Sequence, residues 1–311
     1  MALTDLVDLE LAVPAPEALA AFWERRGLRR TDATTLGTPA RPSQLRLREG
    51  AYRHVSELRL ACDDEADLPA IAERLARLGV EAVVGDGWLR TADPLGDHDV
   101  VVEVAAPAPP AAAAAAPANR PDRHDRVDRR APACTGSAPP PRRLGHVVFG
   151  TPDVAASAAF YRDGLGFRTS DVVGGGIAHF LRCSPDHHNL LLSPAPIPVM
   201  NHYAFEVDDV DAIGLTGAAV LAEGGRSVAG VGRHVVGANL FWYLLDPAGG
   251  MFELFADMDR IVDDEAWERE QRRDDWDPFG VAAWVPGEPA PDFWMPVDLD
   301  ELVAARAAVG R

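Results

Sequence analysis

The sequence predicts an α+β protein in which paired βαβββ units curl their strands into incompletely closed barrels. Two observations lead to this prediction. The two halves of the 311-residue chain resemble each other, and each half alternates strand and helix patterns in the same order. An apolar fraction of 47% is ample for packed cores, and the length favours two globular units.

The first repeat joins a strand to a helix through a proline turn. Residues 11–28 read LAVPAPEALAAFWERRGL, and residues 149–167 read FGTPDVAASAAFYRDGLGF. In both stretches an apolar strand pattern meets a proline, after which apolar or small residues recur at three and four positions, as in a helix. A glycine near the end of each predicted helix is a typical stop signal.

Two further pairings follow later in each half. Residues 56–64 (SELRLACDD) parallel residues 201–209 (NHYAFEVDD), and a helix is expected after each. The tetrapeptides DPLG at 93–96 and DPAG at 246–249 each indicate a turn before a final apolar strand. Strand, helix and further strands therefore recur within each half, and paired units of this kind enclose a cavity.

Four segments are expected along the chain. Residues 1–104 form the first module and residues 142–262 the second. Residues 105–141 between them are rich in Ala and Pro and then polar, a composition that buries too little apolar surface to offset its ordering entropy, so a mobile linker is expected. Residues 263–311 form an acidic, Trp-rich tail that is expected to wrap over the second module or to contact another subunit.

Composition excludes several classes of partner. The net charge of −18 argues against nucleic acid and against an anionic membrane surface. The chain has no apolar run long enough to span a bilayer, and its N-terminal residues lack the pattern of a signal peptide. Three widely separated cysteines fit neither a disulfide framework nor a zinc site, so a cytoplasmic protein is expected.

Three residues of the second half are candidates for one divalent-metal site. His146 and His202 lie in equivalent places at the heads of two predicted strands, and Glu253 lies in an apolar strand after the Asp-Pro turn. A glutamate between apolar neighbours is expensive to bury unless a positive group meets it. Two neutral imidazoles and one carboxylate suit a ferrous ion and leave one face of it open for substrate and O₂.

The segment 232–253, GRHVVGANLFWYLLDPAGGMFE, resembles the signature of extradiol ring-cleavage dioxygenases of the catechol 2,3-dioxygenase and dihydroxybiphenyl dioxygenase type. That signature has Gly-x-His, a short gap, an apolar residue before a tyrosine, then Asp-Pro-x-Gly and a glutamate. Trp242 departs from it, because a smaller residue is usual there, and could narrow the pocket. The family belongs to the vicinal oxygen chelate (glyoxalase/bleomycin resistance) superfamily. The resemblance thus implies two vicinal-oxygen-chelate domains, and covers residues 142–262 well and 5–104 only as fold.

The resemblance implies a role for each site residue. His146, His202 and Glu253 would hold Fe(II), with Mn(II) open as an alternative because both ions accept this ligand set. His234 would face O₂ and the negative charge that develops on oxygen. Tyr243 would hydrogen-bond the substrate or an intermediate.

The segment 186–190, DHHNL, resembles the family's stretch that supplies an acid–base histidine. His188 is preferred to His187 because it shares one strand face with Leu190 and Leu192, although the choice between the two histidines stays open. An imidazole near its ordinary pKa can take the proton that a catechol must lose to chelate a metal.

The expected substrates are a catechol-type aromatic molecule and O₂, bound by a homo-oligomer. An apolar, aromatic pocket is expected from Val148, Ile177, Phe180, Phe205 and Trp242.

The first half is expected to be a scaffold without metal. The residues opposite the three ligands are Asp8, Glu57 and either Val100 or Glu103. A site without imidazole suits neither the family pattern nor a ferrous ion. His54 and His98 are expected at the surface.

Two other functions fit the predicted fold. A lyase or isomerase of the same superfamily would use the metal as a Lewis acid without oxygen, and a metal-free resistance protein would sequester a planar drug. Relatives of the first kind commonly draw ligands from two modules, whereas here one half holds all three. The first alternative has no evident use for His188, His234 and Tyr243. The second needs neither a buried Glu253 nor the aligned histidines. We therefore predict an extradiol dioxygenase that inserts O₂ into a catechol-type ring next to the hydroxyls and opens it.

Overall fold

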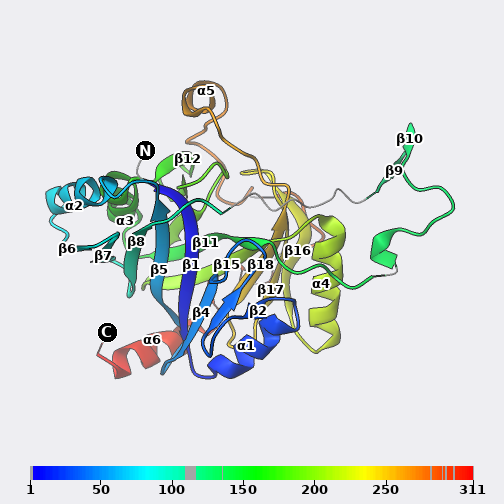
Figure 1. Cartoon of the computed structure of the whole chain (residues 1–311), viewed down its shortest axis with the longest axis horizontal. Coiled ribbons are helices and arrows are strands. Elements are labelled where there is room, and N and C mark those ends of the chain that lie inside the picture. Colours follow the sequence, from blue (N-terminus) through cyan, green and yellow to red (C-terminus); the bar gives the residue numbers. More distant parts are fainter. Residues whose placement is uncertain are drawn as a thin grey trace.

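The computed structural model describes residues 3–108, 117–134, 136–280, 282–288, 290, 293–296 and 298–310. Within them, the first half of the chain forms one mixed sheet and two helices (Figure 1). In chain order these elements are β1 (Leu3–Val13), α1 (Pro16–Glu24), β2 (Arg29–Arg30), β3 (Thr35–Gly37), β4 (Leu45–Glu49), β5 (His54–Cys62), α2 (Asp67–Arg77), β6 (Ala82–Gly85), β7 (Trp88–Ala92) and β8 (Asp99–Val104). The strand order is β2-β3-β4-β1-β5-β8-β7-β6.

The second half repeats this plan. Its elements are β11 (Arg143–Thr151), α3 (Val154–Ala159) with the π-helical turn η2 (Phe160–Leu165), β12 (Arg168–Val173), β13 (Ala178–Arg182), β14 (Leu190–Pro194), β15 (Val199–Glu206), α4 (Val210–Ala222), β16 (Ser227–His234), β17 (Leu240–Leu245) and β18 (Met251–Ala256). The strand order is β12-β13-β14-β11-β15-β18-β17-β16, extended at the end by β19 (Ala282–Trp284) from the tail. Each sheet therefore consists of two βαβββ units and stays open, which confirms the predicted fold class.

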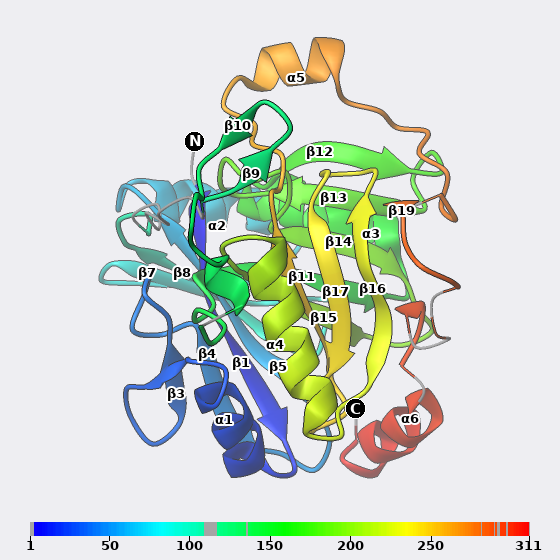
Figure 2. The ribbon, with the colours of Figure 1, turned by 90° about the vertical axis from the view of Figure 1, so that its right-hand side faces the viewer.

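Local sequence explains where the helices of the second half begin and end. Asp153 and Asp209 precede α3 and α4, and each carboxylate accepts a hydrogen bond from the backbone three residues later. Gly166 ends η2 with φ of 101°, a conformation that favours glycine. Helix α4 then lies across the face of the second sheet (Figure 2).

The two sheets share one hydrophobic core. Trp23 of α1 packs on Phe205 and Phe252 of the second sheet, with ring centroids 4.7 and 4.9 Å away. Its indole N–H donates to the Tyr203 hydroxyl at 3.0 Å. In the opposite direction, the Tyr161 hydroxyl donates to Asp93 of the first half at 2.8 Å. Each half thus contributes one aromatic residue from its first helical segment, and that residue packs into the other half.

This interface overturns the expectation for His98. Its side chain is buried, and Nε2 lies 2.9 Å from the Tyr161 hydroxyl. The prediction that His98 lies at the surface was wrong, because the second half covers this side chain. The sequence repeat does not indicate how the two halves pack against each other. His54 is half-buried and its Nδ1 lies 3.1 Å from the Tyr52 carbonyl oxygen.

The segment between the halves carries little regular structure. Within it, residues 109–116 and 135 lie outside the described residues. The rest holds a short hairpin, β9 (Asn119–Arg120) and β10 (Arg123–His124), and a 3₁₀ turn, η1 (Pro132–Cys134), with the hairpin standing away from the two sheets (Figure 1). The tail adds α5 (Asp264–Glu270) and α6 (Leu299–Ala308). Among the described residues, no helix combines the length and the apolar character needed to cross a bilayer.

Candidate metal centre

Three neighbouring strands at the centre of the second sheet carry the candidate ligands. His146 lies on β11, His202 on β15 and Glu253 on β18. His146 and Glu253 both pair with Ala204, two residues along β15 from His202. Because side chains alternate along a strand, the three groups share one face of the sheet. Their ligand atoms lie within 4.8 Å of one another, and all three residues are buried.

Two asparagines orient these groups. Asn239 donates from Nδ2 to Glu253 Oε1 at 2.8 Å, so Oε2 faces the histidines, 2.8 Å from His146 Nε2 and 3.3 Å from His202 Nε2. His202 Nδ1 lies 2.7 Å from Asn201 Oδ1, an acceptor, which keeps the proton on Nδ1 and leaves the Nε2 lone pair available. Neither asparagine was among the predicted site residues, although Asn201 directly precedes His202 and Asn239 lies between His234 and Tyr243 in the sequence.

The donor set fits a divalent cation. His202 Nε2 is buried and has no hydrogen-bond partner among the described residues, a costly state unless another group meets its lone pair. Burial lowers the pKa of His202 to about 4, so this imidazole is neutral at neutral pH. Burial alone would raise the pKa of Glu253, but the adjacent His146 and His202 bring it below its usual range. A neutral imidazole and an ionised carboxylate thus face one point, beside a second imidazole.

His234 and Tyr243 approach the same point from the neighbouring strands. His234 ends β16, and its Nε2 lies 2.8 Å from the Tyr243 hydroxyl on β17 and 4.0 Å from Glu253 Oε1. Burial raises the pKa of Tyr243 well above its ordinary value, so the phenol keeps its proton and can donate a hydrogen bond.

His188 faces the cavity, and His187 points away from it. The His188 ring lies 4.4 Å from that of His146 and lines the cavity, whereas His187 Nε2 lies 2.8 Å from Asp171 Oδ2. Burial lowers the pKa of His188 well below its ordinary value, so the imidazole is neutral. His188 does not share a strand face with Leu190 and Leu192 as predicted, because β14 begins only at Leu190.

A cavity of about 440 Å³ opens in front of these residues. Val148, Ile177 and Phe180 line it, as predicted, but Phe205 and Trp242 do not. Phe205 packs on Trp23, and the indole of Trp242 lies against Gly217 of α4 and donates to Ser227 Oγ at 2.9 Å. Both predictions were wrong because strand alternation turns these two side chains to the opposite face from His202 and Tyr243.

The tail closes part of this cavity. Its outer wall includes Phe279, Phe293, Trp294 and Met295. The Phe293 ring lies 5.2 Å from that of Tyr243, and Asn201 donates to the Phe293 carbonyl oxygen at 3.2 Å. The tail therefore wraps over the second module, one of the two placements expected for it.

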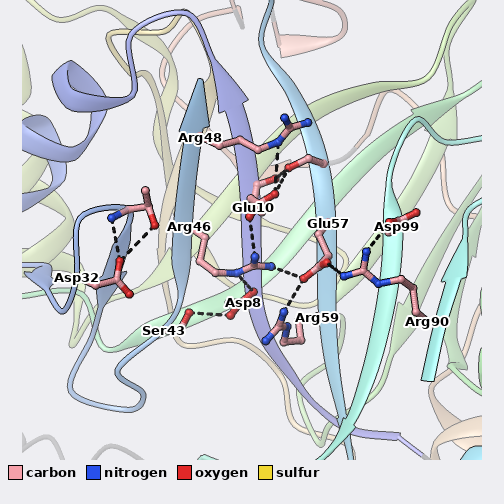
Figure 3. A network of polar contacts seen from close by, with 12 residues as sticks. Asp8, Glu10, Asp32, Ser43, Arg46, Arg48, Glu57, Arg59, Arg90 and Asp99 are labelled. Atoms are coloured by element: carbon pink, nitrogen blue, oxygen red, sulfur yellow. Dashed lines mark hydrogen bonds and ion pairs between the residues drawn. The ribbon is translucent and has the colours of Figure 1, made fainter. Parts of the chain in front are cut away.

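The first sheet fills the equivalent positions with charge (Figure 3). Strand register places Asp8 where the second sheet has His146 and Glu57 where it has His202. Opposite Glu253 stands Val101, and not Val100 or Glu103 as expected. Arg46, the counterpart of the cavity residue Leu191, binds Asp8 at 2.9 Å, Glu10 at 2.7 Å and Glu57 at 2.6 Å. A guanidinium thus neutralises this face from within the chain.

A family model and two characterised relatives are similar to parts of this chain. Residues 143–254 match the family model described as Glyoxalase/Bleomycin resistance protein/Dioxygenase superfamily. The chain is similar to metapyrocatechase 2 of Cupriavidus necator, with 43% identity over 129 residues that make up 41% of this chain and 40% of that protein. It is also similar to an iron-dependent extradiol dioxygenase of Rhodococcus jostii (strain RHA1), with 39% identity over 138 residues, 40% of this chain and 46% of that protein. Each match therefore spans less than half of the relative.

The fold as a whole is similar to that of a Mn(II)-bound glyoxalase from Novosphingobium aromaticivorans. The TM-score is 0.73, and 94% of each chain is covered at 22% identity. At this identity the likeness concerns the fold alone.

Removing one ligand tests the centre. We expect His202→Ala to weaken Fe(II) binding more than about 100-fold, beyond the usual loss on removing an outer-shell partner, without a change in the circular dichroism spectrum. Metal content after anaerobic dialysis measures this. His179→Ala is the matched control, because His179 lies on β13 of the same sheet and does not line the cavity. Equal iron retention by both variants would contradict the ligand assignment.

The buried imidazole also predicts a pH dependence in metal-free protein. Folded His202 stays neutral down to about pH 4, whereas the unfolded chain protonates it near its ordinary pKa of 6.5. The unfolded state therefore binds more protons between these values, and the free energy of unfolding should fall as pH decreases from 6.5 to 4, by on the order of 3 kcal/mol. Urea titrations of wild type and His202→Gln measure it. An identical pH dependence in both proteins would refute the prediction.

The charged face of the first sheet predicts a stability difference between two arginines. Arg46→Met leaves the buried Asp8 and Glu57 without this cation and should lower the free energy of unfolding by about 3 to 5 kcal/mol. Arg48→Met removes only a half-exposed contact of 3.5 Å to Glu10 and should change it by less than about 1 kcal/mol. Urea unfolding of the two variants measures this difference. Similar losses in the free energy of unfolding would show that Arg46 is not needed to neutralise Asp8 and Glu57.

Proposed function

We propose that this chain is an extradiol dioxygenase that opens catechol-type rings with O₂, because its residues 143–254 match the family model described as Glyoxalase/Bleomycin resistance protein/Dioxygenase superfamily. One observation carries the proposal. His202 Nε2, which is buried and has no hydrogen-bond partner among the described residues, faces the same point as His146 and Glu253 Oε2. This point lies at the base of a largely apolar cavity that His188, His234 and Tyr243 also line.

We propose His146, His202 and Glu253 as the ligands of Fe(II), with Mn(II) as the ion to test against it. Two imidazoles and one carboxylate on one side of an ion are typical of ferrous oxygenases. The similarity to a protein named as an iron-dependent extradiol dioxygenase supports the same choice. When bound, the ion supplies Lewis acidity and the redox chemistry that O₂ requires.

His188 is the proposed acid–base residue. Its imidazole is neutral and lines the cavity, so it can take the proton of a catechol hydroxyl and later return a proton to the ring-opened product. The ring of Phe180 lies 5.0 Å from that of His188 and limits the positions open to it. The base is thereby placed beside the proposed ligands, 4.4 Å from the His146 ring.

His234 and Tyr243 are the proposed partners of oxygen. A proton shared between His234 Nε2 and the Tyr243 hydroxyl can be directed to negative charge that develops on oxygen. The apolar walls, including Val148, Ile177 and Phe180, suit an aromatic ring and offer ordered water few hydrogen-bond partners.

A lyase or isomerase reaction on the same metal remains the rival. Such a reaction would use the same three metal ligands and would need neither His234 nor Tyr243. Because it consumes no O₂, measuring oxygen consumption separates the two functions. A cytoplasmic location and assembly into a homo-oligomer stay predictions from the sequence.

Turnover of catechols tests the proposal. We expect protein loaded with Fe(II) under anaerobic conditions to give yellow ring-opened products from mono- or bicyclic catechols on exposure to air, with one O₂ consumed per product. His188→Ala should keep its iron and lose about 10²- to 10⁴-fold in kcat, because it removes the proposed base. The control is again His179→Ala. No oxygen uptake with any catechol, despite stoichiometric iron, would favour the rival.

A further inference from the structure

Two buried, titratable side chains behind His188 have no part in the function proposed above. Asp171 lies on β12 and His187 precedes β14; both are almost fully inaccessible to solvent. Asp171 Oδ2 lies 2.8 Å from His187 Nε2, and His187 Nδ1 lies 3.1 Å from His188 Nδ1. A continuous row of hydrogen bonds therefore leads from a buried carboxylate to the histidine that faces the cavity.

With His187 neutral, the chemistry of each group sets the direction of these bonds. A carboxylate only accepts, so the proton of the first bond is carried by His187 Nε2. In a neutral imidazole the other nitrogen is then an acceptor, so His187 Nδ1 must receive the second bond from His188 Nδ1–H. His188 in its neutral form is left with the lone pair on Nε2. That is the nitrogen not engaged by His187.

We propose that Asp171 and His187 are positioning residues that hold His188 in the Nδ1–H tautomer, so that Nε2 is free to accept the catechol proton. The proposal rests on the proposed function for its consequence, whereas the tautomer follows from the hydrogen bonds of a neutral His187 whether or not the chain cleaves catechols. It also explains why two adjacent histidines are present, because one faces the substrate and the other sets its protonation pattern.

The surroundings hold this row in place. The backbone N–H of Arg273, in the tail, donates to Asp171 Oδ1 at 2.6 Å. Trp267 of α5 donates to the Ser170 carbonyl oxygen at 2.8 Å. On the other side Gly237, with φ of 80°, leaves room for both rings, since a Cβ there would lie 3.1 Å from His187 Nδ1 and 3.3 Å from His188 Nδ1. Hydrogen bonds from the tail thus hold the Asp171 end of the row, and Gly237 allows the backbone to pack closely against the two imidazoles.

The same contacts make one substitution decisive. In Asp171→Asn, the Arg273 N–H keeps the amide oxygen at the Oδ1 position, so the amide nitrogen faces His187 Nε2. That nitrogen donates, and each proton in the row must then reverse. His188 would carry its proton on Nε2 and could no longer act as a base in its neutral form.

Asp186→Asn is the matched control. Asp186 is also buried and directly precedes His187, but its carboxylate binds Arg143 at 2.5 Å and Arg260 at 3.1 Å. Asp186→Asn is therefore the same chemical change at a buried site and weakens two ion pairs, but it alters no hydrogen bond between Asp171, His187 and His188.

Two measurements are made on wild type and both variants. Nitrogen-15 NMR of histidine-labelled, Zn(II)-loaded protein reports the tautomer of His188, and steady-state kinetics with Fe(II) report kcat and KM. We expect Asp171→Asn to change His188 from the Nδ1–H to the Nε2–H form and to lower kcat about 10- to 100-fold, with KM and iron content unchanged. Asp186→Asn should keep the wild-type tautomer and kcat.

An unchanged His188 tautomer in Asp171→Asn, or an equal loss of kcat in Asp186→Asn, would overturn the proposal. The spectrum does not depend on turnover. If wild type cleaves no catechol, the proposed function fails, and the NMR result still decides the tautomer.

Discussion

A carboxylate buried in a protein needs a cation or several hydrogen-bond donors close by, and this requirement acts at the same place in both halves of the molecule. In the second sheet Glu253 is almost completely inaccessible, and it faces two imidazoles and one asparagine amide. No lysine or arginine among the described residues forms an ion pair with it. Those partners leave a point of negative potential beside a free imidazole lone pair, which is the arrangement that a divalent cation would complete.

The first sheet meets the same requirement differently. Its equivalent positions hold Asp8 and Glu57, and the guanidinium of Arg46 enters from β4 where the second sheet has Leu191. The same strand arrangement therefore neutralises its buried carboxylates in two ways. The first half uses an arginine of the chain, and we propose that the second half uses an exchangeable metal ion. The substitution also places a charged side chain in the first half where the second half has an apolar residue of the cavity wall.

Much of this could be predicted from the sequence, because repeats and strand alternation are local patterns. The βαβββ units follow from the paired stretches, and the common face of His146, His202 and Glu253 follows from their equivalent strand positions. Predictions failed where tertiary contacts decide. The burial of His98, for example, depends on its contact with the second half. The errors for Phe205 and Trp242 have another cause, because strand alternation already turns these side chains away from the face of His202 and Tyr243. Asn201, Asn239 and Asp171 act through hydrogen bonds to residues that are distant or whose orientation no sequence pattern gives.

The central claim is that one ion binds where these three side chains converge. Anomalous diffraction at the iron edge, from crystals grown anaerobically with Fe(II), tests it most directly. The account predicts a single strong peak per chain, in contact with His146 Nε2, His202 Nε2 and Glu253 Oε2 and open on the side of the cavity. A peak beside the carboxylates of the first sheet, or a crystal saturated with iron in which His146 still bonds directly to Glu253, would contradict it.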